Sequence, residues 1–144
     1  MNNEAEKAVA ALNEKERLKR IADGKRNALI QNLLMATLRK TIDWKSMADP
    51  AACMCHFPNQ VIELYQFERQ ATESVRIVTG VPSKRTIVRL TITTPDGNPI
   101  EKIDSDSFGD KSLAELYKAA IREAMNADNV IDNLNQMLIN KNSG

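Results

Sequence analysis

The residues with the most obvious chemical potential in this chain are two cysteines and a histidine that lie close together. Cys53 and Cys55 are the only cysteines, and His56 is the only histidine. Thiolates and an imidazole are ligands that zinc prefers, but a structural zinc site takes four ligands, and the usual two-residue spacing between cysteines is absent. The group is therefore a weak metal candidate. We expect it to be a buried loop, with no metal and no other cofactor bound.

Nucleophilic catalysis needs a nucleophile, a base within hydrogen-bond reach and a group that orients the base. Cys55 and His56 are adjacent in the sequence, and neighbouring side chains rarely face each other correctly. The chain has no Gly-x-Ser-x-Gly elbow, no Walker-type loop and no Gly-x-Gly-x-x-Gly motif. The sequence therefore predicts a protein that is not an enzyme.

Two basic segments are the remaining candidates for a functional site. One surrounds the first helical region and the other begins the best predicted strand; their members are Lys15, Arg17, Lys19, Arg20, Lys25, Arg26, Lys84, Arg85 and Arg89. Basic groups on a helix or a β-ribbon can neutralise phosphates. The aromatic residues that support stacking of single-stranded bases are missing from these segments. A solvated, charged face is the favoured interpretation, and a nucleic-acid-binding module is the alternative.

The charge of the chain is balanced overall but unevenly distributed. The net charge is +1, which excludes an acidic mimic of DNA and also excludes nucleic-acid binding by bulk charge alone. Residues 1–45 carry ten Lys or Arg against six Asp or Glu, whereas residues 96–144 carry five against nine. The basic first third and the acidic last third could therefore attract each other, within one chain or between two chains.

Length and composition are those of one globular domain. With 144 residues, 42% hydrophobic and 27% charged, we expect a single domain over 1–144: a polar N-terminal helix (1–24), a core (25–124) and a C-terminal helical extension (125–144). No apolar run is long enough to span a bilayer, and the opening residues lack the pattern of a secretory signal. The cysteine usage is typical of a reducing compartment. These features together predict a cytoplasmic protein.

The first half of the sequence favours helices. Residues 3–22 are good helix formers with a weak apolar stripe, and Asp23-Gly24 predicts a break. Residues 25–42 have the clearest amphipathic pattern in the chain and should form a core helix. Residues 45–59 are typical of a loop. Residues 60–72 fit either a helix or a strand, and the helix is favoured.

The middle of the sequence favours strands. Residues 75–79 and 100–103 flank the strongest strand candidate, residues 85–94, in which Val88, Leu90 and Ile92 occupy one face. The predicted fold class is α+β, with a three-stranded antiparallel meander packed against amphipathic helices and with helical segments at both termini. Asp110 is the expected cap of the last helical region.

The last region, residues 111–141, is predicted to be one long helix or two helices broken near residues 126–129. Its apolar stripe is longer than a small sheet can cover, so we expect its second half to mediate self-association, as a homodimer; the residues concerned are Val130, Ile131, Leu134, Met137 and Leu138. Pairing with the first helix of the same chain is the alternative. The predicted function is a small non-enzymatic inhibitor, adaptor or assembly factor that binds a larger macromolecular partner.

Overall fold

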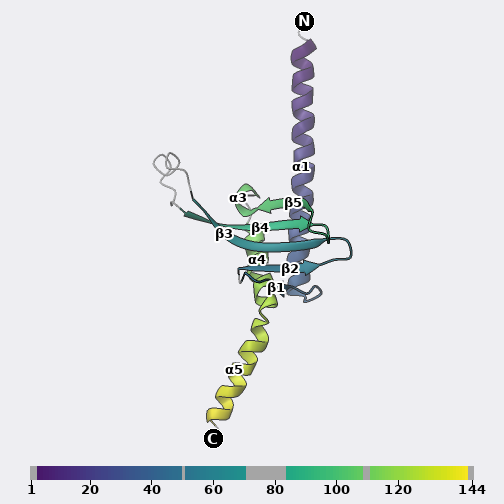
Figure 1. Cartoon of the computed structure of the whole chain (residues 1–144). Coiled ribbons are helices and arrows are strands. Elements are labelled where there is room, and N and C mark those ends of the chain that lie inside the picture. The colour runs from purple at the N-terminus through teal and green to yellow at the C-terminus, as the bar shows by residue number, and fades with distance from the viewer. Residues whose placement is uncertain (1–2, 50, 71–83, 109–110, 143–144) are drawn as a thin grey trace.

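A computed structural model describes residues 3–49, 51–70, 84–108 and 111–142 of the chain (Figure 1). Its centre is a five-stranded antiparallel sheet in which the strands are neighbours in chain order. The strands are β1 (Lys45–Ser46), β2 (Ala52–His56), β3 (Val61–Gln70), β4 (Lys84–Thr93) and β5 (Pro99–Asp104). The helices are α1 (Asn3–Leu38), α3 (Ser105–Phe108), α4 (Ser112–Ala124) and α5 (Ala127–Asn142). The predicted α+β class is confirmed.

The first helix, α1, is continuous over 36 residues, so the break predicted at Asp23-Gly24 is wrong. A single glycine inside a helix costs only about 1 kcal/mol relative to alanine, which the flanking helix formers can offset. The helix ends at Leu38, before the predicted residue 42, and Lys40 adopts a left-handed conformation with φ of 58°. No helix in the described part of the chain is long and apolar enough to cross a membrane.

The segment over residues 60–72, for which a helix is favoured on sequence, is a strand instead. β3 pairs with β4 along ten residues, from Val61 opposite Thr93 to Gln70 opposite Lys84. Ile62 and Leu64 lie on one face of the sheet, and Tyr65 and Phe67 occupy alternating positions. Both faces of β3 therefore carry large side chains, and this distribution resembles a helical pattern over so short a run.

The sheet is larger than the predicted three-stranded meander because β1 and β2 lie in the region predicted as a loop and β3 lies in the region favoured as a helix. β2 pairs with β3 from Ala52 opposite Tyr65 to His56 opposite Val61, and β1 adds a two-residue edge. The strands expected at 85–94 and 100–103 correspond to β4 and β5. The strand expected at 75–79 and the cap expected at Asp110 lie outside the described residues.

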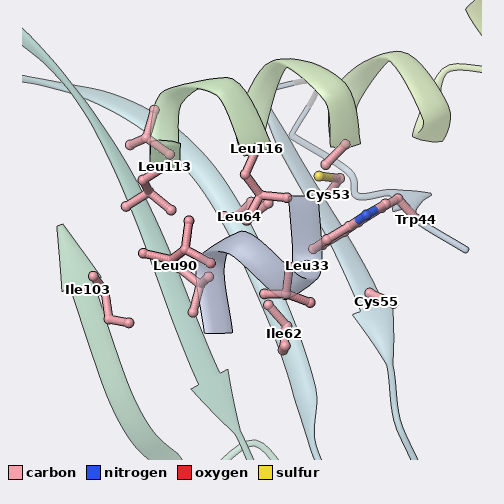
Figure 2. Close-up of a cluster of buried hydrophobic side chains, with 13 residues drawn as sticks. Leu33, Trp44, Cys53, Cys55, Ile62, Leu64, Leu90, Ile103, Leu113 and Leu116 are labelled. Atoms are coloured by element: carbon pink, nitrogen blue, oxygen red, sulfur yellow. The ribbon is translucent and has the colours of Figure 1, made fainter. Parts of the chain in front are cut away.

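The core lies between one face of the sheet and the helices α1 and α4. Figure 2 shows labelled side chains from β2, β3, β4 and β5 meeting Leu33 of α1 and Leu113 and Leu116 of α4. Leu64, Leu90 and Leu116 are fully buried. Aliphatic side chains make up most of this core, and Trp44 is its one buried aromatic residue among those described. The helix predicted over residues 25–42 does reach the core, through Ile30, Leu33 and Thr37.

The C-terminal region forms two helices, which resolves the open alternative between one helix and two. α4 ends at Ala124, and Asn126 takes a left-handed conformation with φ of 56° before α5 begins. Asparagine tolerates this conformation better than most residues, because its short polar side chain can bond locally. The chain therefore changes direction at Asn126. In Figure 1, α5 and the first half of α1 extend from the sheet at opposite ends of the molecule.

Candidate functional site

The most distinctive surface of the molecule is α5. Within α5, all of which the structure describes, no residue is buried. The helix nevertheless has an apolar stripe, because its large apolar side chains recur at intervals of three, four and seven residues. The members of this stripe are 47–57% exposed: Val130, Ile131, Leu134, Met137 and Leu138. We call these five residues the α5 stripe; they are the residues expected from sequence to mediate self-association.

The base of α5 is anchored to the body of the protein by charged contacts. The carboxylate of Asp128 accepts hydrogen bonds from Lys40 Nζ at 3.2 Å and from Arg122 Nη2 at 3.0 Å. These two cations hold the pKa of the Asp128 carboxyl below its usual range. Ser46 Oγ also donates to the carbonyl of Ala124 at 3.1 Å, at the end of α4. The base of α5 therefore contacts the body through exposed polar side chains.

The first half of α1, residues 3–21, is a second projecting helix in which every side chain is exposed. Its large apolar residues do not form one stripe. Leu18 follows Val9 by nine residues, as Ile21 follows Leu12, and nine residues turn a helix by about 180°. Val9 and Leu12 therefore lie on the face opposite Leu18 and Ile21. This helix offers charged and apolar side chains on all sides.

The predicted basic residues are partly neutralised and do not form one patch. Four of the nine are in ion pairs: Arg17 with Glu14, Arg26 with Asp23 and Glu101, Lys84 with Glu68, and Arg89 with Asp104. The other five take part in none of the ion pairs between described residues: Lys15, Lys19, Arg20, Lys25 and Arg85. β4 begins at the end of the sheet that lies away from α1 in Figure 1, so the two basic segments are separated.

Arg89 belongs to a network on the sheet face turned away from α1 and α4. Its guanidinium donates to both carboxylate oxygens of Asp104, at 2.6 and 2.9 Å, and to Tyr65 Oη at 3.2 Å. It also lies 4.7 Å from the ring centre of Phe67. Arg69 bonds to Asp104 at 3.1 Å and to Asp106. This network links β3, β4, β5 and α3.

The network is electrostatically satisfied from within. The hydrogen bonds from Arg89, and then from Arg69, hold the pKa of the Asp104 carboxyl below its usual range. Asp104 and then Tyr65 raise the pKa of Arg89. Because a bidentate arginine–carboxylate pair has little capacity left for a phosphate, Arg89 is a structural residue in this arrangement. The aromatic residues beside Arg89 are not evident from the sequence, where residues 60–72 favour a helix. Strand alternation puts Tyr65, Phe67 and Arg69 on one face.

The three side chains of the weak metal candidate lie on different faces of β2, because successive side chains of a strand point to opposite faces. Cys53 and Cys55 point into the core and are at most 2% exposed, whereas His56 is exposed on a position of opposite parity. Burial raises the pKa of the Cys53 thiol to about 12, and it also raises the pKa of Cys55. No cluster of three potential metal ligands occurs among the residues the structure describes. The two thiols are core residues in this fold, although they lie in a strand and not in the predicted loop.

Two grooves border the second half of α1. One, of about 380 Å³, lies between the end of α1 and the α4–α5 junction and is lined mostly by polar residues, which include Lys40 and Asp128. The other, of about 550 Å³, lies between α1 and the end of the sheet where β2 turns into β3. Its walls are almost entirely apolar, and none of its lining residues is charged. Neither groove is visible in the sequence, because each combines residues that are distant along the chain.

Comparisons of the chain with models of protein families, with curated proteins and with solved structures each found no match.

Proposed function

We propose that this chain is a non-enzymatic interaction protein, of the inhibitor, adaptor or assembly-factor kind, which forms a homodimer through α5 and binds a larger macromolecular partner. The observation that carries the proposal is the exposed α5 stripe. An isolated helix of 16 residues is marginally stable in water, and most helices gain their stability by packing an apolar face. A second molecule that covers the α5 stripe would supply this packing.

The arrangement of the termini supports a cover that comes from outside the chain. The alternative expected from sequence was pairing between α5 and the first helix of the same chain. Those two segments point away from each other at opposite ends of the molecule, so they do not pair in this structure (Figure 1). Closed two-fold dimers are the commonest oligomers, which makes a second copy of the chain the simplest cover.

Light scattering at micromolar concentration tests self-association. We expect a mass of about twice the 16.1 kDa of one chain, and a mass near that of one chain contradicts the dimer. The double variant Ile131→Asp and Leu134→Asp should be monomeric, and its circular dichroism spectrum should show that the rest of the protein is folded. The matched control is Asn129→Asp with Gln136→Glu, which adds the same charge on the face of α5 opposite the stripe and should remain dimeric.

The first half of α1 is the surface we assign to the larger partner, because all of its side chains are available. Capture experiments in extract of the native host can test this role. A protein retained by the wild-type chain should be lost with Val9→Glu plus Leu12→Glu, and should persist with the α5 double variant. Equal retention by all three proteins argues against a binding role for α1.

The alternative function is a nucleic-acid-binding module, and it draws support from the five basic residues that form no ion pair with another described residue. Binding to random duplexes and single strands at several salt concentrations separates the two proposals. Micromolar affinity with a steep salt dependence favours the nucleic-acid module. Absence of binding at low salt favours the protein partner.

A further inference from the structure

The apolar groove beside α1 is another large apolar surface of the described part of the chain. α1 contributes Leu29 and Leu33 to it, the sheet contributes Ile62 and Ile92, and the adjoining loops contribute Ile42 and Phe57. Its polar lining residues are uncharged, and they include Asn32 and Gln60. Any segment that fills this groove must therefore be apolar on the side that it buries, and must bring no unpaired charge with it.

We propose that α5 of one copy docks into this groove of a second copy. The proposal rests on the self-association proposed above and identifies the surface that receives the α5 stripe. Residues 129–140 contain one ionisable side chain, Asp132, and it lies on the side of the helix opposite Leu134, at the middle of the α5 stripe. The other polar residues of this stretch are asparagines and a glutamine. An uncharged stripe flanked by amides thus meets an uncharged groove with amides in its lining.

The first half of α1, which the sequence offers as the partner of α5, fits less well. Nine of its 19 residues are charged, and its apolar residues are divided between opposite faces. A helix packed against it would cover either Val9 and Leu12 or Leu18 and Ile21, and would place the charges of the intervening turns in the contact. The groove has neither defect.

The positions of the groove and of α5 allow two copies to exchange helices reciprocally. Asp128, at the base of α5, is bonded to Lys40, just beyond the end of α1, whereas the groove begins one turn earlier with Ala36. Each copy therefore has its receiving groove close to the base of its own outgoing helix. A two-fold axis that places α5 in the partner's groove then places the partner's α5 in the first groove, and the assembly closes as a dimer.

Disulfide trapping between two differently marked copies tests this arrangement. One copy carries Asn32→Cys in the lining of the groove, and the other carries Met137→Cys at the edge of the α5 stripe. Both changes are at exposed positions, and the native thiols of Cys53 and Cys55 are buried. After mixing and mild oxidation, we expect a disulfide-linked heterodimer. The control pairs Asn32→Cys with Gln136→Cys, which lies on the far side of α5, and should give several-fold less cross-linked product.

Four results overturn the docking proposal. One is equal cross-linking by Met137→Cys and Gln136→Cys in a protein that light scattering shows to be dimeric. That result contradicts docking of α5 into the groove, but it is compatible with self-association. Trapping of Met137→Cys only with itself shows that two α5 helices pair with each other. A monomeric mass of the wild-type protein contradicts both self-association and docking of α5 into the groove. An internal disulfide in a monomeric Asn32→Cys, Met137→Cys double variant would show that α5 reaches the groove of its own chain.

Discussion

α4 and α5 are consecutive helices of similar length, but the apolar stripe of α4 is buried and that of α5 is exposed. Both carry apolar stripes, and only Met125 and Asn126 separate them. α4 buries Leu113, Leu116 and Ala120, whereas α5 buries none of its residues. An amphipathic pattern therefore shows which face of a helix needs cover, and says nothing of whether the cover is in the same chain. The place of the turn between the two helices decides that question.

The largest expected difference between the two helices is in stability. Leu116→Ala should reduce the free energy of unfolding by about 2–5 kcal/mol, because its side chain is fully buried and truncation leaves a cavity. Leu134→Ala should change it by less than about 0.5 kcal/mol when the protein is dilute enough to be monomeric, because the side chain is 51% exposed. Urea unfolding monitored by circular dichroism measures both values.

The Leu134→Ala measurement should be repeated at high protein concentration, where a dimer would form. A cost that grows with concentration is expected if the α5 stripe is covered by a second copy, because association stabilises the folded state. A large cost that is independent of concentration would contradict the distinction between α4 and α5, since it would mean that α5 is buried within one chain.

The elements predicted correctly from the sequence are those whose apolar residues recur with one clear period and pack against neighbouring elements of the same chain. The strands at 85–94 and 100–103 and the stripe of α4 pack within one sheet and one helical layer, and their periodicity is unambiguous. The errors fell where side chains are large on both faces, as in β3, or where a short strand lies among turn residues, as in β2. There the pairing with a distant neighbour, and not local preference, determines the structure.

The buried end of α1 offers the next test. Trp44 Nε1 donates to Thr37 Oγ1 at 2.9 Å, and Thr37 Oγ1 donates to the carbonyl of Leu33 at 2.7 Å. Thr37→Val keeps the shape of the side chain but leaves the buried indole N–H without an acceptor, so we expect a loss of about 1–3 kcal/mol. Thermal unfolding measures it. Leu38→Val, at the adjacent exposed position, is the control and should be nearly neutral.

The pH dependence of the free energy of unfolding at acidic pH should distinguish the ion pairs of the sheet from those at the base of α5. Asp104 and Asp128 both have a pKa lowered by basic partners, so each stabilises the fold above its unfolded pKa of about 3.9 and loses that contribution as the pH falls through its folded value. Asp104→Asn should flatten the decline in stability below pH 4 more than Asp128→Asn does, because Asp128 is exposed and screened by solvent. Urea unfolding between pH 2 and 7 gives both profiles, and equal flattening contradicts the expectation.

The candidate site was only partly accessible from sequence. The α5 stripe was identified because its periodicity lies within one helix. The apolar groove was not, because Leu29, Phe57 and Ile92 come together only through packing of α1 against the sheet. Arg89 was assigned to a basic surface because charge is visible in a sequence, whereas its bidentate pairing with Asp104 depends on the register of β4 and β5.

The smallest expected effect is at Gly24, where the projecting and buried halves of α1 meet. A methyl group added at this position has no atom within 4 Å, and the residue has no positive φ. Gly24→Ala should therefore stabilise the protein by about 0.5–1 kcal/mol through its helix propensity and the reduced entropy of the unfolded chain. The gain should appear in global unfolding, because Arg26 bonds to Asp23 at 3.1 Å and to Glu101 of β5 at 3.2 Å, and these contacts connect this turn of α1 to the sheet.

If the helix broke at Asp23-Gly24, as the sequence alone suggests, the glycine would occupy a left-handed position and alanine would destabilise the protein. The sign of the change in urea unfolding thus decides whether α1 is one helix or two.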